Sequence, residues 1–216
     1  MLQELIVTRE TAYGIRLNRL VKITTLCHEL YGEENGTAII NEYMQQLFPW
    51  LKRSIRADVY HDLNHIFAMT LNADKLAIGY KCDIQSRRRL FLACMFHDVF
   101  HSFGYLPDSA NVGIAISKFI ESHIRLQFCA KDDTLIISDI IFCTVFPFRV
   151  QADNLLQKIA RMADLTMCFE EDVEFFAKGL GAEFKNQGKN IIVTPTDMLE
   201  FTQTSEYIKE LNDYFG

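Results

Sequence analysis

Residues that interrupt helices are scarce in this chain of 216 residues, which has only ten glycines and four prolines. Long segments between these breakers show apolar residues recurring with a period of about 3.6, the pattern of amphipathic helices. Hydrophobic residues make up 49% of the chain, enough to bury a substantial core. We therefore predict an all-α protein, a compact helical bundle that forms one domain over residues 1–216.

Long apolar runs are also lacking. No run reaches the roughly 18 residues that a membrane-spanning helix needs. The N-terminal residues Met1 to Glu4 show no charged-then-apolar signal pattern. These absences predict a cytoplasmic protein with no membrane partner.

The chain also lacks closely spaced cysteine pairs and an excess of positive charge. The six cysteines form no Cys-x-x-Cys pair, so we expect reduced, buried thiols rather than a disulfide framework or a zinc–thiolate site. The net charge of −6 argues against a nucleic-acid polymer as partner, because binding to such polymers depends on neutralising phosphates. A small phosphorylated substrate stays compatible, since a metal centre can outweigh a distant negative field.

The feature that stands out is His97-Asp98, which directly follows the apolar run Leu90–Phe96. This run predicts a buried helix over residues 85–103. A carboxylate buried there without a partner costs several kcal/mol, by order of magnitude. A metal ion or a dense hydrogen-bond network is the usual compensation.

Further metal-binding side chains lie on either side of this pair. His61 and His65 are spaced i, i+4 in a helix predicted from about Ala57 to Gly79, which places them on one helical face. Asp164 interrupts an apolar stretch in a helical region predicted over residues 153–176, and Asp139 is its alternative as fourth ligand. Imidazole and carboxylate together suit Zn, Mn, Fe, Co or Ni, and a carboxylate-rich second site suits Mg or Mn. Each group taken alone also has a structural interpretation. His61 and His65 could be a surface pair, His97-Asp98 could be a structural hydrogen bond, and Asp164 could cap a helix or pair with Arg161.

The order of these motifs resembles the HD-domain metal-dependent phosphohydrolases, and most of all their 3',5'-cyclic nucleotide phosphodiesterase branch. The likeness covers about residues 57–200. It includes Tyr-His-x-x-x-His at 60–65, His-Asp-Val-x-His at 97–101, Leu-Glu-Asn-His-like residues at 120–123 and Ala-Asp-Leu at 163–165. Residues 182–188 and 195–197 resemble the family's Glu-Phe-Phe-x-Gln-Gly and Pro-Thr-Asp. The chain departs from the pattern at Asp62, Phe100, Ser102 and Val145.

The resemblance implies an HD-type bundle with a metal site between core helices, and it implies roles for single residues. The implied metal ligands are His65, His97, Asp98 and Asp164. His61 would be the general acid, and Asp98 would act in catalysis by bridging to a second ion. His101, Glu121 and His123 would support the ligands from outside, and Gln203 would contact substrate. The implied cofactors are two divalent ions (Zn, Mn, Mg, Fe, Co or Ni), and the implied reaction is hydrolysis of a phosphoester of a small nucleotide, foremost a cyclic one.

Two other functions fit the same motifs. One is a signalling domain that binds metal or nucleotide without turnover, and the other is an HD-type di-iron oxygenase that draws further ligands from His101 and His123.

Two smaller features of the sequence also have two interpretations each. Arg87-Arg88-Arg89 at the start of the central helix is either a solvated first turn or a phosphate contact. The aromatic residues Tyr105, Phe146, Phe148 and Phe169 either pack in the core or stack on a base.

The region between Gly179 and Thr194 carries glycines and polar residues, which predict a loop with a short extended piece. Pro195-Thr196-Asp197 then predicts the start of a last helix that runs to about Tyr214.

Overall fold

The computed structural model describes residues 17–54, 59–146, 148, 150–170 and 172–203; of these, the side chains of residues 17, 47–54, 202 and 203 are outside the description. The described residues form α-helices and one short 3₁₀ helix and contain no strand, so the all-α prediction is confirmed. In chain order the elements are α2 (Leu17–Tyr31), α3 (Glu33–Ser54), α4 (Leu63–Gly79), α5 (Ile84–Phe96), α6 (Asp108–Leu126), α7 (Lys131–Phe142), α8 (Leu155–Asp164), η1 (Leu165–Phe169), α9 (Val173–Asn186) and α10 (Pro195–Gln203).

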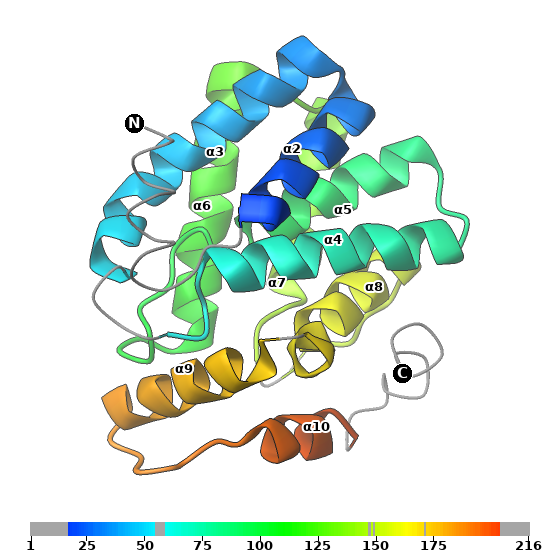
Figure 1. Cartoon of the computed structure of the whole chain (residues 1–216). Coiled ribbons are helices and arrows are strands. Elements are labelled where there is room, and N and C mark those ends of the chain that lie inside the picture. Colours follow the sequence, from blue (N-terminus) through cyan, green and yellow to red (C-terminus); the bar gives the residue numbers. More distant parts are fainter. Residues whose placement is uncertain (1–16, 55–58, 147, 149, 171, 204–216) are drawn as a thin grey trace.

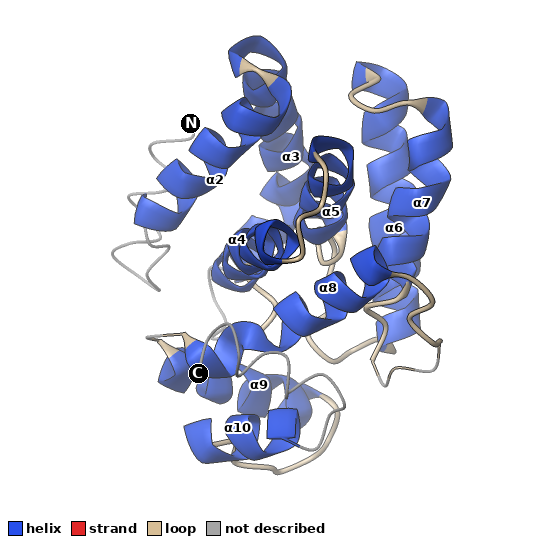
Figure 2. Cartoon of the chain, turned by 90° about the vertical axis from the view of Figure 1, so that its right-hand side faces the viewer, coloured by secondary structure: helices blue, strands red, loops and turns tan. Residues whose placement is uncertain are grey.

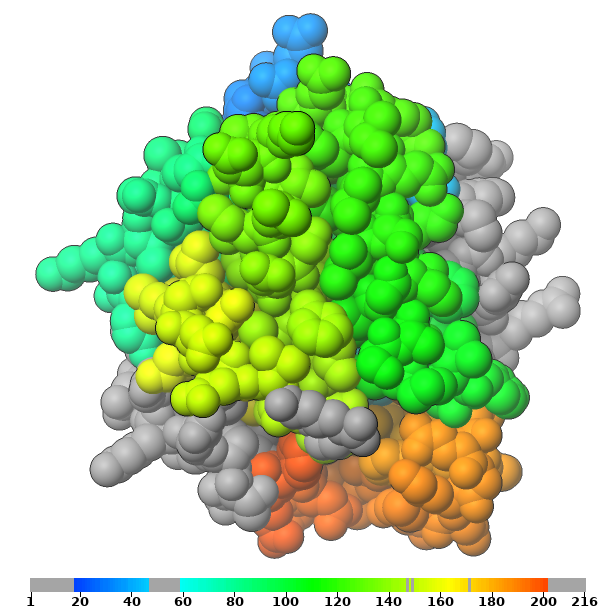
Figure 3. Space-filling view, turned by 180° about the vertical axis from the view of Figure 1, so that it is seen from behind, coloured from blue at the N-terminus to red at the C-terminus, as the bar shows by residue number. Residues whose placement is uncertain are grey.

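Helices α4 and α5 lie at the centre of the bundle. The pair α2–α3 covers them on one side and the pair α6–α7 on the other (Figure 2). Helix α8 packs across α4, and α9 and α10 lie below it (Figure 1). From behind, α6, α7 and α8 form a continuous face with α9 at its lower edge (Figure 3). None of the helices described combines the length and the apolar character that a membrane span requires.

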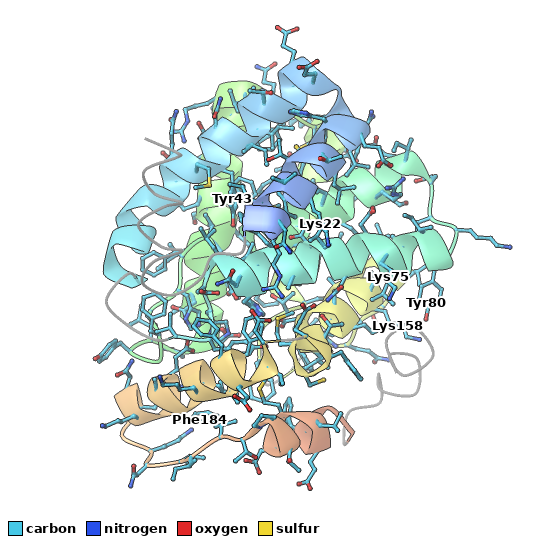
Figure 4. The ribbon with its side chains drawn as sticks, viewed as in Figure 1. Lys22, Tyr43, Lys75, Tyr80, Lys158 and Phe184 are labelled. Carbon is cyan, nitrogen blue, oxygen red and sulfur yellow. The ribbon has the colours of Figure 1, made fainter. Side chains whose placement is uncertain are left out.

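The C-terminal half of α5 is deeply buried in the bundle. Every residue from Leu90 to Phe96 is buried, as the apolar run predicted. Phe96 makes edge-to-face contacts with Tyr43 of α3 and Phe119 of α6. Tyr43, which Figure 4 labels on α3, is fully buried itself. These contacts fix the end of α5, and His97 follows at that point.

The start of α4 differs from the prediction. The helix begins at Leu63 rather than near Ala57, because Asp62 is its N-cap and accepts hydrogen bonds from the backbone N–H groups of Asn64 (2.8 Å) and His65 (3.1 Å). His61 therefore precedes the helix, and the prediction that it shares a helical face with His65 is wrong. The departure from the family pattern at Asp62 has a structural role in this chain.

The end of α5 also differs, since the helix stops at Phe96 and does not reach Phe103. The following loop turns sharply through Phe103 and Gly104, whose φ angles are 55° and 93°. Ser102 holds this loop: its Oγ accepts the N–H of Leu106 (2.8 Å), and its own N–H donates to Oδ1 of Asn111 (3.1 Å). The unusual serine at this position therefore stabilises the loop that carries His101.

The C-terminal region was predicted least well. The expected helical region over residues 153–176 is divided into α8, η1 and the start of α9. The expected loop from Gly179 is helical as far as Asn186. Gly179 lies where α9 crosses the segment before α4, and a Cβ atom there would lie 2.5 Å from the carbonyl carbon of Val59. This glycine permits α9 to lie close to the segment before α4, and that tertiary reason cannot be read from the local sequence.

Candidate metal centre

The four predicted metal ligands converge on one point in the bundle. His65 lies in the first turn of α4, His97 caps the end of α5, Asp98 follows it, and Asp164 is the last residue of α8. The Nε2 atoms of His65 and His97 lie 3.2 Å apart. Oδ2 of Asp98 is 3.3 Å and 2.9 Å from these two nitrogens, respectively. Oδ1 of Asp164 is 3.2 Å from Nε2 of His65 and 3.8 Å from that of His97.

This cluster is deeply buried. His65, His97 and Asp98 are at most 3% exposed, and their ligand atoms all lie within 4.8 Å of one another. Asp164 is the more accessible member, with 19% of its side chain exposed. Asp139, the alternative fourth ligand, is exposed on α7. The structure therefore brings Asp164, and not Asp139, to the histidines.

The Nε2 atoms of both histidines face the cluster. Nδ1 of His97 lies 2.7 Å from the carbonyl oxygen of Cys94, which accepts its proton and leaves Nε2 unprotonated in the neutral ring. Nδ1 of His65 is buried and has no hydrogen-bond partner among the residues described. Two nitrogens and two carboxylate oxygens facing one point form a donor set that fits Zn, Mn, Fe, Co or Ni.

The charges in the cluster favour a cation. Burial on its own would raise the pKa of Asp98, but the positive charges of His97 and His61 hold it well below its usual range. Burial would lower the pKa of His97, yet the attraction of Asp98 and Asp164 raises it to about 9 in the metal-free protein. The field that draws a proton to His97 would equally stabilise a divalent ion.

A second group, His61, His101 and Glu183, lies beside the first. Nδ1 of His61 is 2.6 Å from Oε2 of Glu183, and the backbone N–H of His61 donates to Oε1 at 3.0 Å. Nε2 of His61 points the other way, 4.0 Å from Oδ2 of Asp98. The ring stacks on His101 with a centroid distance of 3.8 Å. Glu183, on α9, therefore fixes His61 with its free nitrogen toward the metal ligands.

The two histidines of this group have opposite electrostatic character. Burial opposes the charge on His61, but Glu183 and Asp98 raise its pKa to about 10. Burial and the neighbouring charge of His61 lower the pKa of His101 to about 4. Nδ1 of His101 accepts the N–H of Phe103 at 3.0 Å, which agrees with a neutral ring. Asp108 lies 3.9 Å from Nε2 of His101, and burial together with Asp98 raises its pKa to about 6.

Two residues that were expected to support the ligands lie elsewhere. Glu121 is exposed on α6 and pairs with Lys118 and Arg125 of the same helix. His123 stacks on Phe119 and lies 3.4 Å from Sγ of Cys129. Both predictions are wrong because α6 passes the site only at its N-terminal end, where Asp108 lies. The side chain of Gln203, at the end of α10, is outside the described residues.

Sequence reasoning missed three contributors to the site. Glu183 matched the family's Glu-Phe-Phe motif, but it fell in a region expected to be a loop and was given no role. Asp108 gave no signal, since it follows Pro107 in what looked like a helix start. The hydroxyl of Tyr60 donates to the carbonyl oxygen of Asp164 (3.4 Å), and its ring packs on that of His65.

No family model, no curated protein and no solved structure matches this chain. The chemistry of the site is therefore inferred from its own side chains. A buried set of four lone-pair donors stands next to a histidine of raised pKa and a neutral histidine. Such a set can hold a Lewis acid and move a proton within the same small space.

Proposed function

We propose that this chain is a metal-dependent phosphohydrolase of the HD-domain type, which hydrolyses a phosphoester of a small nucleotide, most of all a cyclic nucleotide. The observation that carries the proposal is the convergence of His65, His97, Asp98 and Asp164 in the order that the family motifs have. Four residues spread over about a hundred positions meet at one buried point.

Metal binding would be the task of these four side chains. A divalent ion held by them would lower the pKa of a bound water and neutralise charge on a phosphoryl group. The backbone carbonyl of Cys94 orients His97, and the N-cap Asp62 orients the first turn of α4 that carries His65. Asp98 lies between the ligand group and His61, so the same carboxylate faces both the metal ligands and the proton donor.

Proton transfer to the leaving oxygen would be the task of His61. In the metal-free protein Glu183 and Asp98 raise the pKa of His61 to about 10, and its Nε2 faces the metal ligands while Nδ1 faces Glu183. The contact with Glu183 does not depend on the metal and favours the protonated ring. Glu183 stabilises the imidazolium through its contact with Nδ1. The neutral His101 stacks against the ring and restricts its rotation.

An aromatic surface beside the site supports a substrate with a flat ring. Phe146 is 50% exposed, and its backbone N–H donates to Oδ2 of Asp108, which lies next to His101. Phe148 and Phe201 make edge-to-face contacts with Phe146 at 5.8 Å and 5.6 Å. Exposed aromatic rings this near a phosphate-handling centre suit a nucleobase, which gains about 1–3 kcal/mol from stacking on such a ring.

A di-iron oxygenase is the second candidate, and one observation favours it. His61, His101 and Glu183 offer three ligand atoms within 4.8 Å of one another, so this group could hold a second ion. In that case His61 would be a ligand and not a proton donor. Iron content of about two per chain together with substrate-dependent oxygen consumption would identify this function.

The test combines elemental analysis of the purified protein with phosphate and nucleoside monophosphate release from a panel of cyclic and linear nucleotides under added Mn or Mg. We expect bound metal and metal-dependent hydrolysis, both strongly reduced in Asp164→Asn. His28→Ala is the matched control, since His28 contacts Thr37 away from the site. Bound metal without release from any substrate would instead indicate the non-catalytic signalling domain, and absence of metal would contradict the proposal.

A further inference from the structure

A cavity of about 300 Å³ lies at the opposite end of α5 from the metal centre. It opens where the end of α2, the start of α5 and the start of α7 meet, and Figure 2 shows α5 between the two helix pairs that supply these walls. Its size falls at the lower end of the range for small-molecule sites. The residues that matter for its chemistry are Tyr31, Asn35, Arg88, Phe128, Cys129 and Asp133.

The three arginines that open α5 have different surroundings. Arg87 is paired with Asp74 and Glu29. Arg89 is paired with Asp133, so its charge is compensated. Arg88 lines the cavity, and only its Nε–H donates a hydrogen bond, to the carbonyl oxygen of Leu30 (2.6 Å). Within the described part of the chain, its two terminal amino groups have no hydrogen bond or ion pair.

The guanidinium of Arg88 is held in place without being neutralised. It lies over the ring of Tyr31 at 5.5 Å, and the hydroxyl of Tyr31 donates to the carbonyl oxygen of Arg88 (2.8 Å). A fixed guanidinium with two free amino groups matches the two oxygens of a carboxylate or phosphate. Because the side chain is already ordered, little rotamer entropy is lost when an anion binds.

The other walls decide what kind of anion fits. Asp133 is buried, but Gln85 and Arg89 satisfy its oxygens, so it leaves no unpaired negative charge in the cavity. Leu92, Phe128 and Ile137 supply apolar surface deeper in the cavity. An oxyanion that carries a flat apolar group would place its charge on Arg88 and its ring against this surface.

We propose that this cavity is a second ligand site, independent of the metal centre, for a small organic oxyanion with a planar ring. Arg88 is its anion-binding residue, and Tyr31 and Phe128 are its aromatic contacts. Arg88 and His97 are nine residues apart along α5, roughly 13 Å at about 1.5 Å per residue, so one small molecule does not occupy both sites.

The first test uses the full chain treated with a chelator, so that binding does not depend on metal. Benzoate, adenosine monophosphate and inorganic phosphate are titrated by calorimetry. Site-resolved alkylation then reports the position, because Cys129 lines the cavity, Cys168 follows the metal ligand Asp164, and Cys82 precedes α5. We expect the two ring-bearing anions to bind at least tenfold more tightly than phosphate and to protect Cys129 alone.

Variants give the second test. Arg88→Gln should weaken binding at least tenfold, whereas Arg87→Gln removes the same charge one position earlier and should not. Asn35→Asp introduces a carboxylate at the exposed rim of the cavity without changing size and should also weaken binding at least tenfold, even if Arg88→Gln does not fold. Binding unchanged in both cavity variants, protection of Cys168 instead of Cys129, equal affinity for inorganic phosphate, or no binding of any probe would overturn the proposal. None of these outcomes depends on whether the metal centre hydrolyses phosphoesters.

Discussion

At the scale of single residues, the two carboxylates on either side of His61 determine the charge state of its ring. Glu183 holds Nδ1 at 2.6 Å, and Asp98 lies 4.0 Å from Nε2. Both carboxylates stabilise the imidazolium, and this agrees with the proposed role of His61 as a proton donor rather than a base.

The first prediction concerns turnover. His61→Ala should lower kcat by about 10²–10⁴-fold, the usual contribution of a general acid, while bound metal stays at the wild-type level. Elemental analysis and kcat on the same preparation check both parts. Unchanged turnover would remove His61 from the proposed role.

The second prediction uses Glu183→Gln to test whether Glu183 sets the pKa of His61. Because Glu183 raises the pKa of His61, the neutral amide should lower that pKa and move the alkaline limb of the kcat profile to lower pH. Asp139→Asn, a change on the exposed face of α7, is the control and should leave the profile in place. A profile that does not move in Glu183→Gln would mean that the contact seen here does not set the pKa of His61.

A third prediction follows from the neutral, buried His101. Its pKa in the folded protein is about 4, below the unfolded value of about 6.5, so below pH 6.5 the unfolded chain takes up a proton that the folded chain does not. The free energy of unfolding should therefore fall as pH drops from about 6.5 to 4, by about 3 kcal/mol at most from this residue. Urea unfolding of metal-free protein across this window measures the slope. His101→Gln should flatten it, and an equal slope in both proteins would contradict the assignment.

At the scale of elements, the site depends on how closely α9 approaches the segment before α4. Gly179 makes this approach possible, since a Cβ atom there would lie 2.5 Å from the carbonyl carbon of Val59 and 2.6 Å from the nitrogen of Tyr60. The same crossing places Glu183, one turn further along α9, against His61.

The fourth prediction tests this crossing. Gly179→Ala should destabilise the fold by about 1–3 kcal/mol, as overpacking does, and should lower kcat because Glu183 is displaced from His61. Gly113→Ala is the matched control: Gly113 lies within α6, has open space around its Cα, and should be neutral or stabilising by up to about 1 kcal/mol. Denaturant unfolding and kcat are measured for both variants. Equal free energies of unfolding and equal kcat values would show that a Cβ atom at position 179 is accommodated without strain.

At the scale of the whole molecule, the proposed metal ligands come from three helices that are distant in sequence. His65 comes from α4, His97 from the end of α5 and Asp164 from the end of α8. A bound ion would therefore link the centre of the bundle to the segment that leads into α9. Metal binding and global stability should be coupled.

The fifth prediction follows from this coupling. Metal at about 100 times its Kd should add about 2.7 kcal/mol to the free energy of unfolding, which raises the Tm of a chain of this size by roughly 5–10 °C. Thermal unfolding with Zn or Mn, and again after a chelator, measures the shift. Asp164→Asn should reduce the shift and Asp139→Asn should not. A Tm that does not change when metal is added would contradict the proposed metal site.

The sequence by itself determined the fold class, and it indicated the proposed ligands His65, His97 and Asp98, with Asp164 and Asp139 both open as the fourth. Helical periodicity is local, and the burial of His97-Asp98 follows from the apolar run before it, so both can be derived without a structure. Only the tertiary structure decided that His61 precedes α4, that Glu183 is its partner, and that Glu121 and His123 lie elsewhere. These facts depend on the N-cap at which α4 begins and on how closely α9 approaches the segment before α4 at Gly179. The contacts of Gly179 with Val59 and of Glu183 with His61 join residues more than a hundred positions apart, and no local pattern records them.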